Sequence, residues 1–177
     1  MELFTFYSTL TGIATLVFQL IFLVGILWMF LDMKGVRGTL EQHGVLAVFI
    51  ISLIGMVGSL IFSIGFQLPP CNLCWWQRIF LYPIVFLTGG SLFFGIGTKR
   101  VVLIQSGILA GIGFLFSLYH SFIQWGLFAE AGTCGAGSVS CTIVDVLKFG
   151  YITIPVMCGT LFGLILYSVI HGTWHKK

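Results

Sequence analysis

The sequence predicts an all-α integral membrane protein: a four-helix transmembrane bundle with one additional N-terminal transmembrane helix, or five spans. Charged residues make up only 7% of the 177 residues, and hydrophobic residues make up 58%. The mean hydropathy is +1.10. A soluble domain carries about 25% charged residues, so this composition excludes one. Five apolar segments each approach the ~20 residues that cross a bilayer as a helix, and they lie roughly at 4–31, 45–66, 79–97, 101–124 and 150–170.

The first segment, 4–31, is expected to be a retained helix and not a signal peptide. It follows Met1-Glu2 without a basic region, it is too long for a signal-peptide core, and no small-residue cleavage site precedes Asp32. We therefore divide the chain into an extra N-terminal helix with a cytoplasmic loop at 1–44 and a four-helix bundle at 45–177. The extra helix is expected to be peripheral, because its polar side chains are mild and carry no redox chemistry: Ser8, Thr9, Thr11, Thr15 and Gln19.

Basic residues predict the orientation of the chain. Six of them fall in three regions on the same side of the predicted membrane: Lys34, Arg37, Lys99, Arg100, Lys176 and Lys177. The positive-inside rule assigns that side to the cytoplasm. The other side carries only Arg78 and Lys148, so the N-terminus is expected outside and the C-terminus in the cytoplasm.

A Cys-x-x-Cys motif stands where the third span begins. Cys71 and Cys74 lie at the predicted N-terminus of that helix, where the helix dipole favours a thiolate. Arg78 follows Cys74 by four residues, so both lie on one helix face and the cation favours the thiolate further. A dithiol in this setting is typical of a redox site.

The longest outer loop, about 125–149, holds two more cysteines. Gly132, Gly135 and Gly137 surround Cys134, which predicts a flexible stretch able to move a cysteine. After Cys141, apolar residues alternate with polar ones, which we interpret as a short helix lying in the membrane interface. All four of these cysteines are predicted to lie outside the cytoplasm, where disulfides persist.

The run from Cys71 to Arg78 (Cys-Asn-Leu-Cys-Trp-Trp-Gln-Arg), with Tyr82-Pro83 in the same helix, resembles the disulfide bond formation protein B (DsbB) family, in its short-loop, BdbC-like branch. The segment from His120 to Gln124, the loop cysteines and Ile154-Pro155 are also similar to that family. The similarity covers roughly residues 45–171. The additional helix at 4–31 departs from the four-helix pattern.

The resemblance implies a membrane thiol:quinone oxidoreductase of the bacterial inner membrane. Such an enzyme reoxidises an extracytoplasmic DsbA-like thiol oxidase of the thioredoxin fold and passes the electrons to ubiquinone or menaquinone. It implies two disulfides, Cys71–Cys74 and Cys134–Cys141. The partner's thiolate would attack Cys134, and Cys141 would then attack Cys71, leaving Cys74 as a thiolate facing the quinone.

The resemblance also implies the residues of a quinone site. Arg78 and His120 are the expected donors to quinone oxygens, with Gln77 and Gln124 beside them. Neither a metal site nor a nucleic-acid partner is expected.

Other interpretations of these residues stay open. The four outer cysteines could form two structural disulfides, although a disulfide that closes a loop as short as Cys-x-x-Cys stabilises a fold little. A zinc site made from all four is disfavoured by the spacing of the second pair. Arg78 could simply extend its head group to the interface, His120 could be a hydrogen-bonded core residue, and Gln124 could join helices.

Two further features are expected to be structural. Cys158 lies in the middle of the last span and is interpreted as an inert buried thiol. Gly107 and Gly111, four residues apart, predict a close-packing helix face.

Two other functions also fit a membrane bundle with cysteines. An enzyme of the vitamin K epoxide reductase type uses a similar electron path, but its loop cysteines precede the Cys-x-x-Cys motif, whereas here Cys71 and Cys74 come first. A non-enzymatic membrane scaffold or thiol transporter would not need Arg78 and would show no quinone-dependent turnover.

Overall fold

A computed structural model of the protein describes residues 2–30, 34–129 and 139–173. This part of the chain is helical and holds no strand longer than an isolated bridge. Five of its helices are long and apolar enough to cross a membrane, which confirms the predicted fold class. The elements are α1 (Glu2–Phe30), α2 (Lys34–Leu60), the π-helical turn η1 (Ile61–Gly65), α3 (Asn72–Phe94), α4 (Lys99–Gln124) and α5 (Ile154–Thr173).

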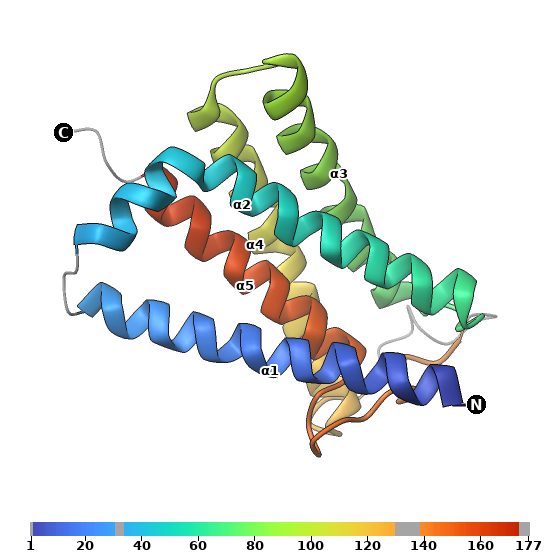
Figure 1. The fold of residues 1–177 in the computed structure, drawn as a ribbon. Coiled ribbons are helices and arrows are strands. Elements are labelled where there is room, and N and C mark those ends of the chain that lie inside the picture. The colour runs from blue at the N-terminus through green and yellow to red at the C-terminus, as the bar shows by residue number, and fades with distance from the viewer. Residues whose placement is uncertain (1, 31–33, 130–138, 174–177) are drawn as a thin grey trace.

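Helices α2 to α5 form the bundle, and α1 lies along its side (Figure 1). The closest packing joins α4 with α5, α2 with α5, α3 with α4, and α2 with α3, while α1 packs mainly against α5. The beginnings of α1 and α3 and the 139–153 segment share one end of the molecule. The cysteines at the start of α3 therefore lie at the same end as Cys141.

The third helix begins at Asn72, where the Cys-x-x-Cys motif predicts its N-terminus and ahead of the apolar segment 79–97. Cys71 caps it with an extended backbone, and its Sγ accepts a hydrogen bond from the amide of Cys74 at 3.4 Å. Gln77 is polar but almost fully buried, so one face of the first turns points into the bundle, while Trp75 and Trp76 are exposed on the other. Gly95, with φ +66°, ends the helix in the left-handed conformation that glycine tolerates best.

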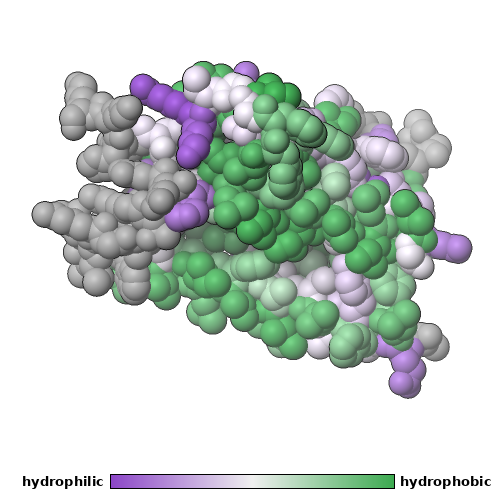
Figure 2. Space-filling view, turned by 45° about the horizontal axis from the view of Figure 1, so that its top comes forward, coloured by the Kyte–Doolittle hydropathy of each residue, from purple (hydrophilic) through white to green (hydrophobic). Residues whose placement is uncertain are grey.

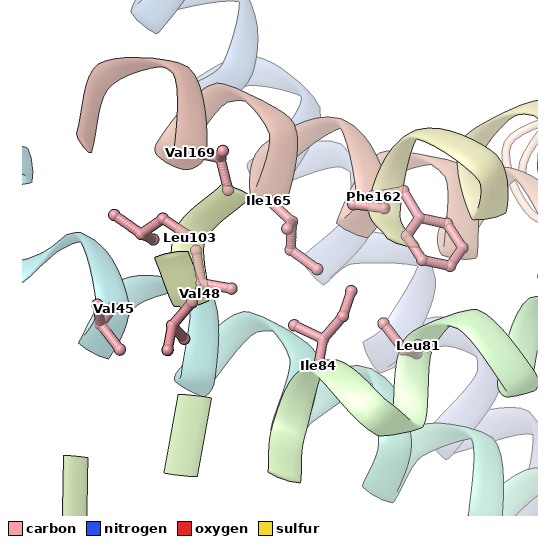
Figure 3. Close-up of a cluster of buried hydrophobic side chains, with 10 residues drawn as sticks. Val45, Val48, Leu81, Ile84, Leu103, Phe162, Ile165 and Val169 are labelled. Carbon is pink, nitrogen blue, oxygen red and sulfur yellow. The ribbon is translucent and has the colours of Figure 1, made fainter. Parts of the chain in front are cut away.

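A cluster of buried hydrophobic side chains lies between the bundle helices (Figure 3). Phe162 of α5 is fully buried, and its ring occupies the space that a side chain at Gly113 of α4 would need. Packing of this kind, with small residues letting helices approach, is the main source of helix association in lipid. The side chains labelled in Figure 3 come from all four bundle helices: Val45, Val48, Leu81, Ile84, Leu103, Phe162, Ile165 and Val169.

The outer surface is apolar in the middle. Figure 2 shows hydrophobic residues across the centre of one face and hydrophilic residues toward its ends. On α1, Leu3 and Phe6 are among many large hydrophobic side chains that point away from the bundle. An exposed apolar surface of this extent suits contact with lipid.

The predicted interfacial helix after Cys141 is wrong. Residues 139–153 form turns, and Lys148 pairs with Ile152 in an isolated bridge. Phe149 (φ +52°) and Gly150 (φ +79°) make the reversal that this bridge closes. The β-branched residues Ile143 and Val144 also lose side-chain freedom in a helix, which favours the irregular path.

Candidate redox site

Cys71 and Cys74 meet at the N-terminus of α3. Both are free thiols in this structure, with their Sγ atoms 3.0 Å apart in a hydrogen bond. Cys71 is buried, at 5% exposure, while Cys74 is half-buried. The hydrogen bond from Cys74, followed by that from His120, lowers the pKa of Cys71, although burial opposes the shift. The predicted Cys71–Cys74 disulfide would be the oxidised form of this pair, and it stays a prediction.

His120 of α4 stands beside Cys71 and is almost completely buried. Its Nε2 lies 3.7 Å from Sγ of Cys71 and 3.2 Å from the carbonyl oxygen of Cys141. The side-chain amide of Gln77 donates to Nδ1 at 3.2 Å. Because Nδ1 accepts, Nε2 carries the proton of a neutral ring and donates toward the sulfur and the carbonyl oxygen. Gln77 thus sets the histidine tautomer.

Arg78 is fixed between helices and does not simply reach for the interface. Its Nη1 donates to Oγ of Ser63 at 3.3 Å, and its Nη2 donates to the carbonyl oxygen of Ser59 at 3.2 Å. The guanidinium also lies 5.5 Å from the ring centroid of Trp75. Ser63 belongs to η1, and such π-helical turns are frequent at functional sites. These contacts hold the guanidinium against α2, one turn away from Cys74.

Gln124 joins α4 to the 139–153 segment. Its amide donates to the carbonyl oxygen of Ile143 at 3.1 Å, while its Oε1 is buried and has no partner among the residues described. The contact is between a helix and a loop, so it is not the helix–helix contact considered from the sequence. A role for Gln124 in binding a quinone stays a prediction.

Cys141 packs directly against Cys71 of the Cys-x-x-Cys pair. It is disulfide-bonded and 1% exposed, and it forms one buried cluster with Cys71, Leu73 and Ile123. Cys134, its predicted partner, lies outside the described residues. Burial, and then the charge of Cys71, raise the pKa of Asp145 on the same segment.

One cavity of about 490 Å³ brings the predicted residues together. This volume is typical of a site for a small organic ligand. Its wall includes six of the residues singled out from the sequence, Cys71, Cys74, Gln77, Arg78, His120 and Gln124. The free thiol of Cys158 also lines it.

The sequence did not predict that α1 takes part in this wall. Tyr7, Thr11, Ala14, Thr15 and Phe18 all line the cavity, although the first helix was expected to be peripheral. The sequence did contain a sign of this shared face, since residues 7, 11, 14, 15 and 18 are spaced so that they lie on one side of a helix. Because Tyr7, Thr11 and Thr15 are only mildly polar, this shared face did not stand out in the sequence.

Three potential metal ligands also meet here. Sγ of Cys71, Sγ of Cys74 and a ring nitrogen of His120 all lie within 4.8 Å of one another. Both nitrogens of His120 already have protein partners in Gln77 and Cys141. The arrangement is thus complete as a hydrogen-bonded thiol site without an ion.

A membrane bundle with a dithiol at a helix N-terminus, a buried histidine beside it and a disulfide-bonded cysteine packed against both defines a thiol–disulfide protein of the membrane. The chain belongs to the disulfide bond formation protein DsbB family, whose model matches residues 41–170. That match favours this family over the vitamin K epoxide reductase type. Helix α1 lies outside the matched segment.

Relatives that carry this function in their names match most of the chain. A probable disulfide formation protein of Oceanobacillus iheyensis is 36% identical over 132 residues, covering 73% of this chain and 87% of the relative. The SPbeta prophage-derived disulfide bond formation protein B of Bacillus subtilis is 36% identical over 121 residues, covering 68% and 78%. A probable disulfide formation protein C of Bacillus cereus is 37% identical over 131 residues, covering 73% and 89%. No solved structure matches the chain.

Proposed function

We propose that the protein is a thiol:quinone oxidoreductase that reoxidises a DsbA-like thiol oxidase outside the cytoplasm and passes the electrons to a membrane quinone. The observation that carries this proposal is the position of Cys71. Its sulfur packs against Cys141 on one side and lines the cavity that also contains Arg78 and Cys74 on the other. One pair of cysteines therefore has access to both an outer disulfide and a ligand site.

Electrons move in three balanced exchanges. The partner's dithiol reduces the Cys134–Cys141 disulfide and becomes a disulfide itself. Cys141 then attacks Cys71 of the inner disulfide, and closure of the outer pair leaves Cys71 and Cys74 as two thiols. These two thiols give up two electrons and two protons as they close again.

The residues of the cavity suit a quinone. A quinone supplies an acceptor for two electrons and two protons, with two carbonyl oxygens that take hydrogen bonds. Arg78 has five N–H donors, and the contacts with Ser59 and Ser63 leave others for a ligand. Ubiquinone and menaquinone both offer such oxygens. The mainly apolar helices around the cavity exclude water and so strengthen these interactions.

His120 would stabilise Cys71 as a thiolate. Its Nε2–H is directed at Cys71, the sulfur that leaves Cys141 as a thiolate when Cys134 closes the outer pair. The same N–H lies within reach of the Cys141 carbonyl, which keeps the outer cysteine beside its target.

Membership of this family supports a bacterial inner-membrane location. The charge pattern supports an orientation with the N-terminus outside and the C-terminus in the cytoplasm. In this orientation, Cys71, Cys74 and Cys141 face the compartment in which disulfides form.

Thiol trapping tests the proposal. Membranes containing the protein and a reduced thioredoxin-fold thiol oxidase are quenched with an alkylating reagent, with and without added ubiquinone or menaquinone. Added quinone should oxidise the cysteines to disulfides before the quench, so that fewer of them are alkylated, and the partner should become oxidised. Cysteines that keep one redox state in all conditions would show a structural role instead.

A further inference from the structure

Helix α1 presents two different faces. The residues that point outward are large and aliphatic or aromatic, and Phe6 is 67% exposed. The face toward the bundle carries Tyr7, Thr11 and Thr15, and all three line the same cavity as Cys71 and Arg78. Thr15 is only 5% exposed, so this face is buried despite its polarity.

Tyr7 lies close to the part of α2 that holds Arg78. Its hydroxyl would be 3.6 Å from a Cβ placed on Gly58, and the next residue, Ser59, accepts a hydrogen bond from Arg78. Its ring packs edge-on against Phe62 at 5.1 Å between centroids. The Tyr7 hydroxyl has no hydrogen-bond partner among the residues that the structure describes, whereas Thr11 and Thr15 bond to backbone carbonyls of their own helix.

Polar contacts fix α1 in register against the bundle. Gln19 donates to Oγ1 of Thr160 at 3.2 Å and accepts from the Tyr151 hydroxyl at 2.6 Å. Nearer the outer end, Nζ of Lys148 donates to Oγ1 of Thr9 at 3.0 Å. Few polar groups are available in a membrane span, so these contacts specify where α1 lies. The position of Tyr7 at the cavity follows from that register.

We propose that α1 forms one wall of the quinone site, and that Tyr7 contacts the quinone head group. This inference rests on the proposed function. The Tyr7 hydroxyl would donate a hydrogen bond to a quinone oxygen on the side of the cavity next to Arg78. Thr11, Thr15 and Phe18, on the same face of α1, would contact the rest of the quinone. The wall lies outside the segment that the family model matches, so it is a feature this chain adds to the matched bundle.

The test compares neighbouring residues on opposite faces of α1. Tyr7→Phe removes only the hydroxyl, Tyr7→Leu also removes the ring, and Phe6→Leu is the matched control on the exposed face. Quinone affinity is measured by quenching of tryptophan fluorescence with a short-chain quinone, and turnover by quinone reduction over a range of concentrations. Tyr7→Phe should weaken quinone affinity and raise the quinone KM about 3- to 10-fold, as the loss of one hydrogen bond does. Tyr7→Leu should have a larger effect, and Phe6→Leu none.

A variant that fills the cavity, and a reaction that does not use the cavity, distinguish a lost quinone contact from a folding defect. Ala14→Leu removes nothing but occupies space in the cavity, and it should also raise the quinone KM. Single-turnover oxidation of the thiol partner occurs at the outer cysteines and should stay within about twofold of the wild type in every correctly inserted variant.

The outcomes separate the two proposals. If the wild type reduces quinone and the Tyr7 and Ala14 variants match it in affinity and KM, α1 is not part of the site and the inference is overturned. A cavity filled by a lipid chain would give that result. If the wild type neither binds nor reduces quinone, the proposed function fails and the inference fails with it.

Discussion

Nε2 of His120 lies 3.7 Å from Sγ of Cys71. The same nitrogen is 3.2 Å from the carbonyl oxygen of Cys141, and Gln77 holds the other side of the ring. One imidazole therefore connects the two cysteines between which electrons are proposed to pass. Residues from α3, α4 and the 139–153 segment are needed to build this arrangement.

His120 should contribute, after Cys74, to the acidity of Cys71. Since the hydrogen bonds from Cys74 and His120 lower the pKa of Cys71, the reduced wild type should keep a thiolate at pH values where an ordinary cysteine, with a pKa of ~8.5, is protonated. That stabilisation of the reduced form is full above the ordinary pKa and is lost as the pH falls through the lowered one. In His120→Ala the alkylation of Cys71 should need a higher pH, and mass spectrometry of the alkylated protein across pH 3–9 measures this. Superimposable profiles for wild type and variant would remove His120 from the thiolate site.

The order of the cysteines should appear in trapped intermediates. Cys141→Ser removes the thiol that resolves the first exchange, so a mixed disulfide between Cys134 and the partner should accumulate. Cys134→Ser should abolish that adduct. The measurement is non-reducing gel electrophoresis followed by peptide mapping. A partner bound through Cys71 would instead reverse the assignment of the outer and inner pairs.

Two glycines of α4 should respond differently to the same substitution. Gly113→Ala places a methyl group against the fully buried ring of Phe162, whereas an added Cβ at Gly111 meets nothing within 4 Å. The prediction that Gly111 shares a close-packing face with Gly107 is therefore wrong for Gly111. Gly113→Ala should destabilise the bundle by about 1–3 kcal/mol, as overpacking does, and Gly111→Ala should be neutral or slightly stabilising. Thermal unfolding in detergent compares the two variants, and equal stability would contradict the packing described for α4 and α5.

Arg78 should be sensitive to a change that keeps its charge. Arg78→Lys loses the planar head that reaches both Ser59 and Ser63 while offering further donors to a ligand. Quinone use should weaken about tenfold or more, since a hydrogen bond to a charged group is worth ~1.5–3 kcal/mol. Exchange between the partner and the outer cysteines should survive. Steady-state quinone reduction beside single-turnover oxidation of the partner separates these effects, and unchanged quinone kinetics in both Arg78→Lys and Arg78→Ala would reduce Arg78 to a structural anchor.

The sequence was most informative where local pattern decides the structure. Apolar length predicted the five spans, and the Cys-x-x-Cys motif predicted where α3 begins. The redox role of that motif stays a prediction. It was less informative where tertiary contacts decide. Alternating polarity after Cys141 suggested a helix, but the Lys148–Ile152 bridge and the turn at Phe149 and Gly150 prevail.

The sequence also could not predict the hydrogen-bond partners of the site residues. The contacts between Gln77 and His120, and between Arg78 and Ser59, join residues far apart in the chain, so spacing could not reveal them. The cavity face of α1 was missed because threonine and tyrosine in a membrane helix have many structural uses.

The central claim is that Cys71 and Cys74 deliver electrons to a quinone, and a stoichiometric reaction tests it most directly. Protein reduced at these two cysteines is mixed without oxygen with a slight excess of quinone, and the absorbance of the quinone is followed while the remaining thiols are counted. The account predicts one quinone reduced for each pair of thiols lost, with Cys71 and Cys74 recovered as a disulfide. Loss of the reaction in Cys74→Ser is the matched control. Quinone that stays oxidised while both thiols remain alkylatable would contradict the account.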